Sequence, residues 1–408
     1  MVRKSAVAIL LSVGLLWLTT QNAWGIFGKE DKGEHWVGTW ACSPQLAEAD
    51  NLPPAPGFAD TTLRQIIHVS VGGAQIRVRF SNAFGKTSLT ILAAHVAKPA
   101  GASAIQDGTD KALTFHGQPS VIIPAGALMY SDPLDFDLPA LSELAITIYV
   151  QGAPNGITMH PGSRTTSYLA EGNFVSAPDL SVPRRVDHWY FLNGVDAAGD
   201  NSAESLVVLG DSITDGSKST TNGNDRWPDE LARRLQADRK SVGVLNEGIG
   251  GNRLLLDSVG PNALARFDRD VLAQTSPRWI IVFEGVNDIG TCTKGCNLDS
   301  LAQQIIGAYE QIVARAHSHK IRVYGATITP FGGSFYASAD GERARQTVNS
   351  WIRAAGHFDG VIDFDSVARD PRNPSQLAPE ADSGDHLHPA DGGYRQMGDS
   401  VDLKLFSK

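Results

Sequence analysis

Cysteine is scarce in this chain, an excess of basic charge is missing, and long apolar runs are confined to its start. None of the three cysteines stands with histidine at a spacing typical of a zinc site. Acidic residues outnumber basic ones by 44 to 35, giving a net charge of -9, which argues against nucleic acid or an anionic membrane surface as a partner. No segment after residue 25 is apolar enough to span a membrane, and no repeats or low-complexity tracts occur.

Residues 1–25 have the pattern of a signal peptide. A basic start at Arg3 and Lys4 is followed by an apolar run over 6–18 and by small residues that allow cleavage after Gly25. The run is shorter than the roughly 20 residues that a membrane-spanning helix needs, although an uncleaved anchor is the alternative. We therefore expect a secreted or periplasmic protein with no stable membrane insertion after signal cleavage.

Export would place the cysteines in an oxidising compartment. Cys292 and Cys296 are four residues apart, and Gly295 would ease the closure of a small disulfide loop between them, so a disulfide there is plausible. Cys42 has no such partner, and the apolar pair Trp40-Ala41 before it predicts a buried, inert thiol.

Two patterns divide the rest of the chain. Residues 35–196 carry short alternating runs split by Gly, Pro, Asn and Asp, as in the two strands expected around Gly72 and Gly73, which predicts an all-β sandwich or jelly-roll domain. The small, polar residues 197–204 are the expected linker. Residues 205–408 alternate apolar strands at 206–209, 242–245, 279–283, 321–326 and 361–364 with amphipathic helices at 226–238, 261–273, 298–317 and 340–355.

This alternation predicts an α/β domain, with a parallel sheet covered by helices on both faces. Ligands in such sheets bind beyond the carboxyl ends of the strands. The stretch "VVLGDSITDG" at 207–216 brings Ser212 to the end of the first strand, where its side chain can be a nucleophile and its backbone N–H an oxyanion donor. A plain helix cap is the other interpretation of Ser212.

Two further strand ends carry candidate donors. Gly248, Gly250 and Gly251 follow the second strand and permit close approach of the backbone to a ligand, although they also suit a simple turn. Asn287 follows the third strand, where its amide can donate to an oxyanion or merely close a turn, and Asp288 beside it is expected to be structural.

A candidate base lies near the C-terminus. Asp385 and His388 are three residues apart, so the carboxylate can orient the imidazole that takes the proton from Ser212. Two alternatives exist in this stretch: His386 as the base, although an extended segment would point it away, and a metal site of Asp385, His386 and His388, which lacks a further ligand cluster.

Together these stretches resemble the four blocks of the GDSL, or SGNH, hydrolase family. The matching residues are Gly210 to Gly216, Gly251, Asn287-Asp288 and Asp385-x-x-His388-Pro389, in the family's order over roughly 205–405. The resemblance implies Ser212 as nucleophile, its backbone N–H with Gly251 and Asn287 as the oxyanion hole, and His388 with Asp385 as base and orienting acid. It also implies a flavodoxin-like SGNH hydrolase fold for 205–408, and no metal or organic cofactor.

Two details qualify the resemblance. Glu284 adds an acid beside the third block; it can raise the pKa of His388 or bind substrate hydroxyls, or else it faces solvent or pairs with Arg253. The Gly-x-Ser-x-Gly turn of α/β-hydrolases is absent around Ser212, which disfavours that larger fold. The N-terminal half resembles the β-rich domain that precedes the hydrolase domain in a secreted branch of the family.

The sequence thus predicts a carboxylic ester hydrolase that works through an acyl-enzyme on Ser212. Short acyl groups, such as acetyl groups on carbohydrate, are the favoured substrates because the chain carries a β-rich domain and shows no long apolar lid segment. The partner would be a small-molecule or polysaccharide ester. A lysophospholipase or short-chain lipase is the first alternative, and an inactive glycan-binding protein is the second.

Overall fold

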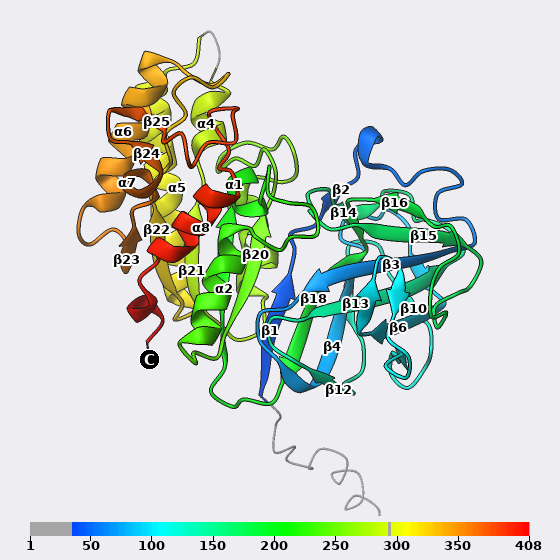
Figure 1. Cartoon of the computed structure of the whole chain (residues 1–408). Coiled ribbons are helices and arrows are strands. Elements are labelled where there is room, and N and C mark those ends of the chain that lie inside the picture. Colours follow the sequence, from blue (N-terminus) through cyan, green and yellow to red (C-terminus); the bar gives the residue numbers. More distant parts are fainter. Residues whose placement is uncertain (1–34, 293–294, 408) are drawn as a thin grey trace, which may run out of the picture. The chain divides into compact units, whose positions relative to one another are not determined.

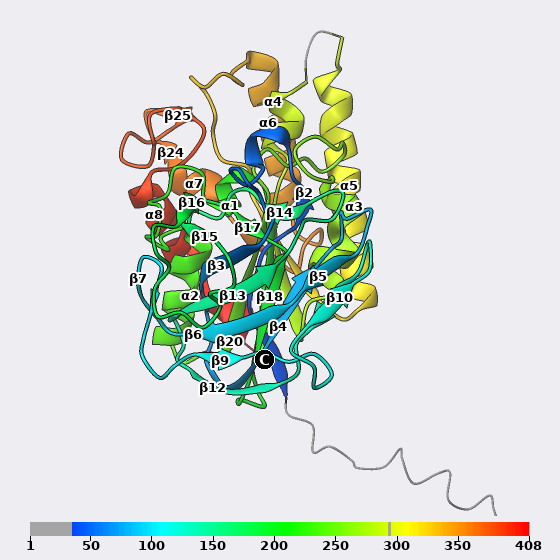
Figure 2. The same ribbon diagram turned by 90° about the vertical axis from the view of Figure 1, so that its right-hand side faces the viewer.

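Two arrangements of strands make up the computed structural model, which describes residues 35–292 and 295–407 (Figures 1 and 2). The expected signal peptide at 1–25 lies outside the described residues. Residues 35–407 include an N-terminal half built almost wholly of strands and a C-terminal half built on one parallel sheet. Within the described residues, no helix is long and apolar enough to cross a membrane.

The N-terminal half holds two larger antiparallel sheets. The five-stranded sheet has the order β1-β18-β4-β11, with β12 also on β4; its strands are Trp36–Ala41 (β1), Leu192–Ala198 (β18), Gly73–Ser81 (β4), Leu128–Tyr130 (β11) and Leu134–Leu138 (β12). The six-stranded sheet has the order β16-β15-β3-β13-β6-β9; its strands are Arg184–Val186 (β16), Ser167–Glu171 (β15), Thr61–His68 (β3), Glu143–Val150 (β13), Ala93–Ala97 (β6) and Lys111–Ala112 (β9).

Alternating side chains from both sheets meet in one hydrophobic core. Ile76 and Val78 of β4 are buried in the same cluster as Ile146 and Ile148 of β13. Smaller groups complete this half: β17-β14-β2 (Trp189–Tyr190, Thr158–His160, Gln45–Leu46), β10-β5 (Val121–Ile123, Leu89–Ile91) and β7-β8 (Pro99–Gly101, Ala104–Ile105). Two antiparallel sheets with a shared core are compatible with the expected β-sandwich.

The C-terminal half contains a parallel sheet in the order β20-β19-β21-β22-β23. Its strands span Glu204–Gly210 (β19), Val242–Gly248 (β20), Pro277–Phe283 (β21), Arg322–Ala326 (β22) and Gly360–Ile362 (β23). In chain order this is 2-1-3-4-5, the flavodoxin-like arrangement that the resemblance implied. The chain leaves β19 for one neighbour and later returns to the other, so the topological switch point lies at the end of β19.

Helices cover this sheet on opposite sides (Figure 2). They are Ser212–Asp215 (α1), Trp227–Ala237 (α2), Ala263–Phe267 (α3), Val286–Gly290 (α4), Leu298–Ser318 (α5), Ala339–Arg353 (α6), Phe364–Ala368 (α7) and Asp391–Ser400 (α8). Helix α2 packs against α8, and α5 packs against α6. A small hairpin of Arg369–Asp370 (β24) and Asn373–Leu377 (β25) follows α7.

Several boundaries differ from the sequence prediction. The two strands expected around Gly72 and Gly73 are present as β3 and β4, which belong to different sheets. Phe364 begins α7 instead of ending a strand, since the Asp363 side chain caps that helix by accepting from Ser366 N. The expected linker 197–204 is shorter, because residues 197–198 belong to β18 and Glu204 begins β19.

Strand β1 also lies against the parallel sheet. Its Gly38 N–H donates to Ser205 Oγ (3.1 Å), and a Cβ at Gly243 of β20 would lie 1.9 Å from Gly38 O. Only a chain without side chains at this crossing brings the two backbones so close. The two halves of the chain therefore touch through their backbones at this crossing. The domain boundaries 35–196 and 205–408 stay a prediction from the sequence.

Candidate active site

The candidate residues gather at the carboxyl ends of the parallel strands. Ser212 begins α1 directly after β19, which is the strand at the topological switch point. Asp211 caps this helix, since its Oδ1 accepts from Ile213 N (2.9 Å). A Cβ at Gly210 would lie 2.1 Å from Thr214 Oγ1, so the turn from strand to helix needs glycine there.

Ser212, His388 and Asp385 form a continuous hydrogen-bonded chain. Ser212 Oγ lies 2.9 Å from His388 Nε2, and His388 Nδ1 lies 2.8 Å from Asp385 Oδ2. The other carboxylate oxygen, Oδ1, accepts from the backbone N–H groups of Leu387 (3.0 Å) and His388 (2.8 Å). Burial alone would raise the pKa of Asp385, but these hydrogen bonds lower it to about 2, so the carboxylate is charged beside the imidazole.

His386 takes no part in this chain. Its Nδ1 lies 2.5 Å from Asp382 Oδ2, and its side chain is half exposed. Ser212 contacts His388 instead, so the geometry favours His388 over the alternative base. Among the described residues, no group of three or more His, Cys, Asp or Glu side chains is arranged to hold a metal ion.

The two candidate oxyanion donors flank Ser212 from the neighbouring strands. Asn287 Nδ2 donates to Asn252 O (2.8 Å), and Asn287 Oδ1 accepts from Tyr336 Oη (3.0 Å). Gly251 adopts a φ of 72°, which glycine tolerates. In the described part of the chain, the backbone N–H groups of Ser212 and Gly251 donate to no protein group, and the second amide hydrogen of Asn287 is likewise unpaired. These three donors are the ones the sequence named.

Arg266 contacts the ends of the parallel strands, a role that the sequence did not predict. It is 1% exposed, and one guanidinium contacts all three segments that carry the candidate residues. Its hydrogen bonds run from Nε to Asn252 Oδ1 (3.0 Å), from Nη1 to Ser43 Oγ (2.7 Å) and Glu247 O (2.6 Å), and from Nη2 to Gly210 O (3.0 Å). Arg266 Nη2 also lies 3.4 Å from Glu284 Oε1, so one side chain contacts the strand ends before Ser212, Gly251 and Asn287.

Glu284 corrects a prediction. It neither faces solvent nor pairs with Arg253, because it is 1% exposed and lies 3.4 Å from Arg266 Nη2. Burial raises its pKa well above the usual range, and the nearby Asp211 charge adds to this rise. Burial likewise raises the pKa of Asp211 to about 7 and that of Asp288 to about 6. Asp288 accepts from the backbone N–H groups of Leu254 and Leu255, as its expected structural role requires.

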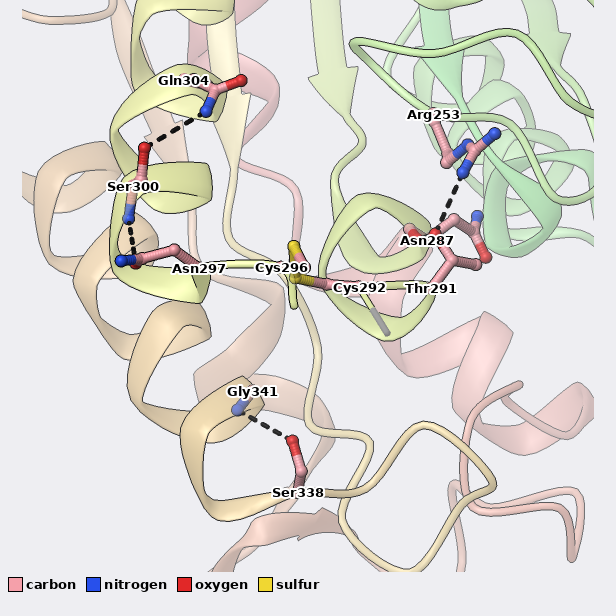
Figure 3. Close-up of a disulfide and its surroundings, with 10 residues drawn as sticks. All are labelled: Arg253, Asn287, Thr291, Cys292, Cys296, Asn297, Ser300, Gln304, Ser338 and Gly341. Atoms are coloured by element: carbon pink, nitrogen blue, oxygen red, sulfur yellow. Dashed lines mark hydrogen bonds between the residues drawn. A yellow bond between two sulfur atoms is a disulfide. The ribbon is translucent and has the colours of Figure 1, made fainter. Parts of the chain in front are cut away.

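A disulfide follows the helix that carries Asn287. Cys292 and Cys296 are joined, and Thr291 before them donates from Oγ1 to Asn287 O (2.6 Å) while accepting from Arg253 (3.2 Å), as Figure 3 shows. A hollow of about 390 Å³ is lined by Arg253, Thr291, Leu255, Leu256, Leu301 and the disulfide. Cys42 is buried, as predicted, and burial raises the pKa of its thiol.

Comparison with known proteins identifies this half. Residues 208–396 match the GDSL-like Lipase/Acylhydrolase family. The chain carries a GDSL-like lipase/acylhydrolase domain. The matched segment contains Ser212, Gly251, Asn287, Asp385 and His388, and it includes the parallel sheet from within β19 onward. The protein is accordingly a carboxylic ester hydrolase.

Several solved structures are similar to this half of the chain. A protein assigned to the G-D-S-L lipolytic family from Desulfitobacterium hafniense is 26% identical, and the match covers 48% of this chain and 96% of that one, with a TM-score of 0.37. A lipase/acylhydrolase from Enterococcus faecalis is 22% identical over 50% of this chain and 94% of its own (TM-score 0.38). A variant of an acetyl xylan esterase from Geobacillus stearothermophilus is 20% identical over 50% and 95% (TM-score 0.39). No curated protein matches the chain.

Proposed function

We propose that the protein is an exported serine esterase in which Ser212 is the nucleophile. The observation that carries this proposal is the hydrogen-bonded chain from Ser212 Oγ through the His388 ring to the Asp385 carboxylate. The serine is 8% exposed and stands at the switch point of the parallel sheet, where a substrate can reach it from beyond the strand ends.

In the acylation step, His388 Nε2 accepts the proton of Ser212 Oγ while this oxygen forms a bond to the ester carbonyl carbon. The negative charge that develops on the carbonyl oxygen accepts from Ser212 N–H, Gly251 N–H and the free amide hydrogen of Asn287. When the tetrahedral intermediate collapses, the bond to the leaving oxygen breaks and His388 gives its proton to the alcohol. A water molecule then attacks the acyl-enzyme by the same proton transfers and releases the acid.

Asp385 serves this cycle through its hydrogen bond to His388 Nδ1. A ring whose Nδ1 donates to a carboxylate must present Nε2 as the acceptor in its neutral form, which is the state that can take the serine proton. The negative charge of Asp385 then stabilises the imidazolium. Because the carboxylate is held by two backbone N–H groups, its orientation is fixed before substrate binds.

Export is proposed from residues 1–25 as a signal peptide. The Cys292–Cys296 disulfide supports this placement, since disulfides persist in secreted and periplasmic proteins and are rare in the cytosol. The N-terminal half, residues 35–196, is proposed to be a β-sandwich domain that precedes the hydrolase domain.

For the substrate we propose short acyl esters, with acetyl groups on carbohydrate as the favoured class. The hollow beside Thr291 mixes the charged Arg253 with leucines, which suits a substrate that carries polar groups. Leu256, 60% exposed on this hollow, favours the second candidate, a lysophospholipase or short-chain lipase. The two differ in chain length: an acetylesterase should lose activity beyond butyrate, and a lipid enzyme should gain it.

The test is hydrolysis of p-nitrophenyl esters from acetate to palmitate by the wild type and the Ser212→Ala variant. Fast acetate cleavage that is lost in Ser212→Ala supports the serine esterase and the short-chain preference. Retention of wild-type turnover in a folded Ser212→Ala preparation would refute the mechanism. If the wild type cleaves none of the esters but binds polysaccharide, the glycan-binding alternative replaces the proposed function.

A further inference from the structure

One side chain of the N-terminal half reaches the helix that carries Ser212. His160 is the last residue of β14, and its Nε2 lies 2.9 Å from Oδ1 of Asp215, the last residue of α1. Both side chains are almost fully buried. Strand β14 and helix α1 can be followed in Figure 2. The contact spans 55 residues of sequence and joins the two halves at the catalytic end of the parallel sheet.

The hydrogen bonds of His160 define how it holds Asp215. Its Nδ1 lies 2.9 Å from Ser43 O, and because a carbonyl can only accept, Nδ1 carries a hydrogen. The other ring nitrogen, Nε2, lies against the Asp215 carboxylate. Arg164 approaches the other oxygen, Oδ2, at 3.9 Å. A buried carboxylate with these two partners has a fixed orientation, and removing one of them is costly.

The packing around α1 leaves Asp215 little freedom to move. A Cβ at Gly162, two residues after His160, would lie 1.9 Å from Asp215 Oδ2. On the side of the parallel sheet, a Cβ at Gly248 would lie 2.4 Å from the Asp215 backbone nitrogen. The end of α1 is thus packed between a loop of the N-terminal half and the end of β20.

Helix α1 depends on such contacts because it has only four residues, from Ser212 to Asp215. A single turn of helix has no stability of its own in water. Its first residue is Ser212 and its last is Asp215, so a displacement of the anchored end moves the serine relative to His388. Small displacements of a reacting atom can cost about 10²-fold in rate.

We propose that His160 is a positioning residue for Ser212, through which the N-terminal half supports the catalytic centre. This inference rests on the proposed function, because it takes Ser212 as the nucleophile. His160 acts through Asp215 and does not touch the substrate. His160 does not line the hollow near Arg253. Its replacement should therefore lower kcat and leave KM unchanged.

The experiment compares the full-length wild type with His160→Ala, His160→Gln and Ser212→Ala on p-nitrophenyl acetate. We expect His160→Ala to lower kcat by about 10- to 100-fold with KM within about twofold. The rate at which a fluorophosphonate labels Ser212 should fall in parallel. His160→Gln should recover most of both rates, since its amide nitrogen can donate to Asp215, and a role in global stability alone would not produce this pattern.

His95→Ala is the matched control. His95 of β6 also pairs with an aspartate, through 2.9 Å between its Nδ1 and Asp110 Oδ2, but this pair lies within the N-terminal half, and its loss should leave kcat unchanged. Gly162→Ala, whose methyl group would overlap Asp215, tests the same contact with His160 intact and decides the matter if His160→Ala does not fold.

A folded His160→Ala or Gly162→Ala variant with wild-type kcat and labelling rate overturns the proposal. If Ser212→Ala is inactive in the same experiment, the proposed function stands and only the positioning role fails. If Ser212→Ala is fully active, the proposed function itself fails, whatever His160 does.

Discussion

Tyr336 should set the orientation of the Asn287 amide, and removing its hydroxyl group is a small, well-defined perturbation. The hydroxyl donates to Asn287 Oδ1 at 3.0 Å while Asn252 O accepts from Asn287 Nδ2 at 2.8 Å. These two bonds leave one amide hydrogen directed away from both partners. One neutral hydrogen bond contributes about 0.5–1.5 kcal/mol, so Tyr336→Phe should reduce kcat by about 2- to 12-fold and leave KM nearly unchanged.

Asn287→Ala should be far more damaging, because it removes the donor itself. Loss of one oxyanion donor typically costs about 10²–10³-fold in kcat. If Tyr336 acts only through Asn287, the double variant should be no slower than Asn287→Ala alone, since coupled residues are not additive. Steady-state kinetics on p-nitrophenyl acetate, with kcat and KM determined separately for the four proteins, measure this coupling.

Tyr324→Phe is the control for loss of a buried tyrosine hydroxyl. Its hydroxyl donates to Leu405 O near the C-terminus, and its removal should affect unfolding more than kcat. Fully additive losses in the Tyr336→Phe/Asn287→Ala double variant would refute the orientation argument. So would an unchanged kcat in Tyr336→Phe.

Three other perturbations have defined outcomes. Burial raises the pKa of Glu247 to about 8, so this carboxyl ionises at lower pH in the unfolded chain than in the folded one, and the free energy of unfolding falls as pH rises from about 4.5 to 8. In urea unfolding, Glu247→Gln should lose less stability than the wild type over this range, and parallel pH profiles of the two proteins would contradict the argument. Asp385→Asn should lower kcat on p-nitrophenyl acetate by up to about 10⁴-fold, because the imidazolium of His388 loses its charged partner. A loss below tenfold would contradict the proposed role of Asp385. Replacing Cys292 and Cys296 by serine should cost about 2 kcal/mol in guanidinium unfolding, as expected for so short a loop, and an unchanged midpoint would show that the bridge adds no stability.

The sequence predicted most of the candidate residues that lie at the carboxyl ends of the parallel strands. Ser212, Gly251 and Asn287 were expected there because each follows an apolar run of strand length, and the carboxyl ends of parallel strands meet at one edge. The pair Asp385 and His388 was recognisable from its spacing. These residues lie in short local patterns, which a single sequence displays directly.

Contacts between distant segments were not predictable in this way. Arg266 lies in an amphipathic helical stretch like many others, and its partner Ser43 is 223 residues away in the sequence. His160 carries no local motif at all. For Glu284 the sequence left two interpretations open, an effect on His388 or substrate, and a position facing solvent or beside Arg253. Neither named its partner Arg266, because nothing in the sequence shows that Arg266 lies within reach. Charged side chains near a site acquire their partners only when the sheets come together.

The crossing of β1 with the parallel sheet bears on how the protein unfolds. Gly38 and Gly243 allow direct backbone contact between the two halves at one end of the parallel sheet. At the other end, His160 joins the halves again through its contact with Asp215. A protein joined at both ends in this manner has no weak boundary along which one half can melt first. We therefore expect a single cooperative transition in calorimetry, and poor folding of residues 205–408 when they are expressed without the N-terminal half.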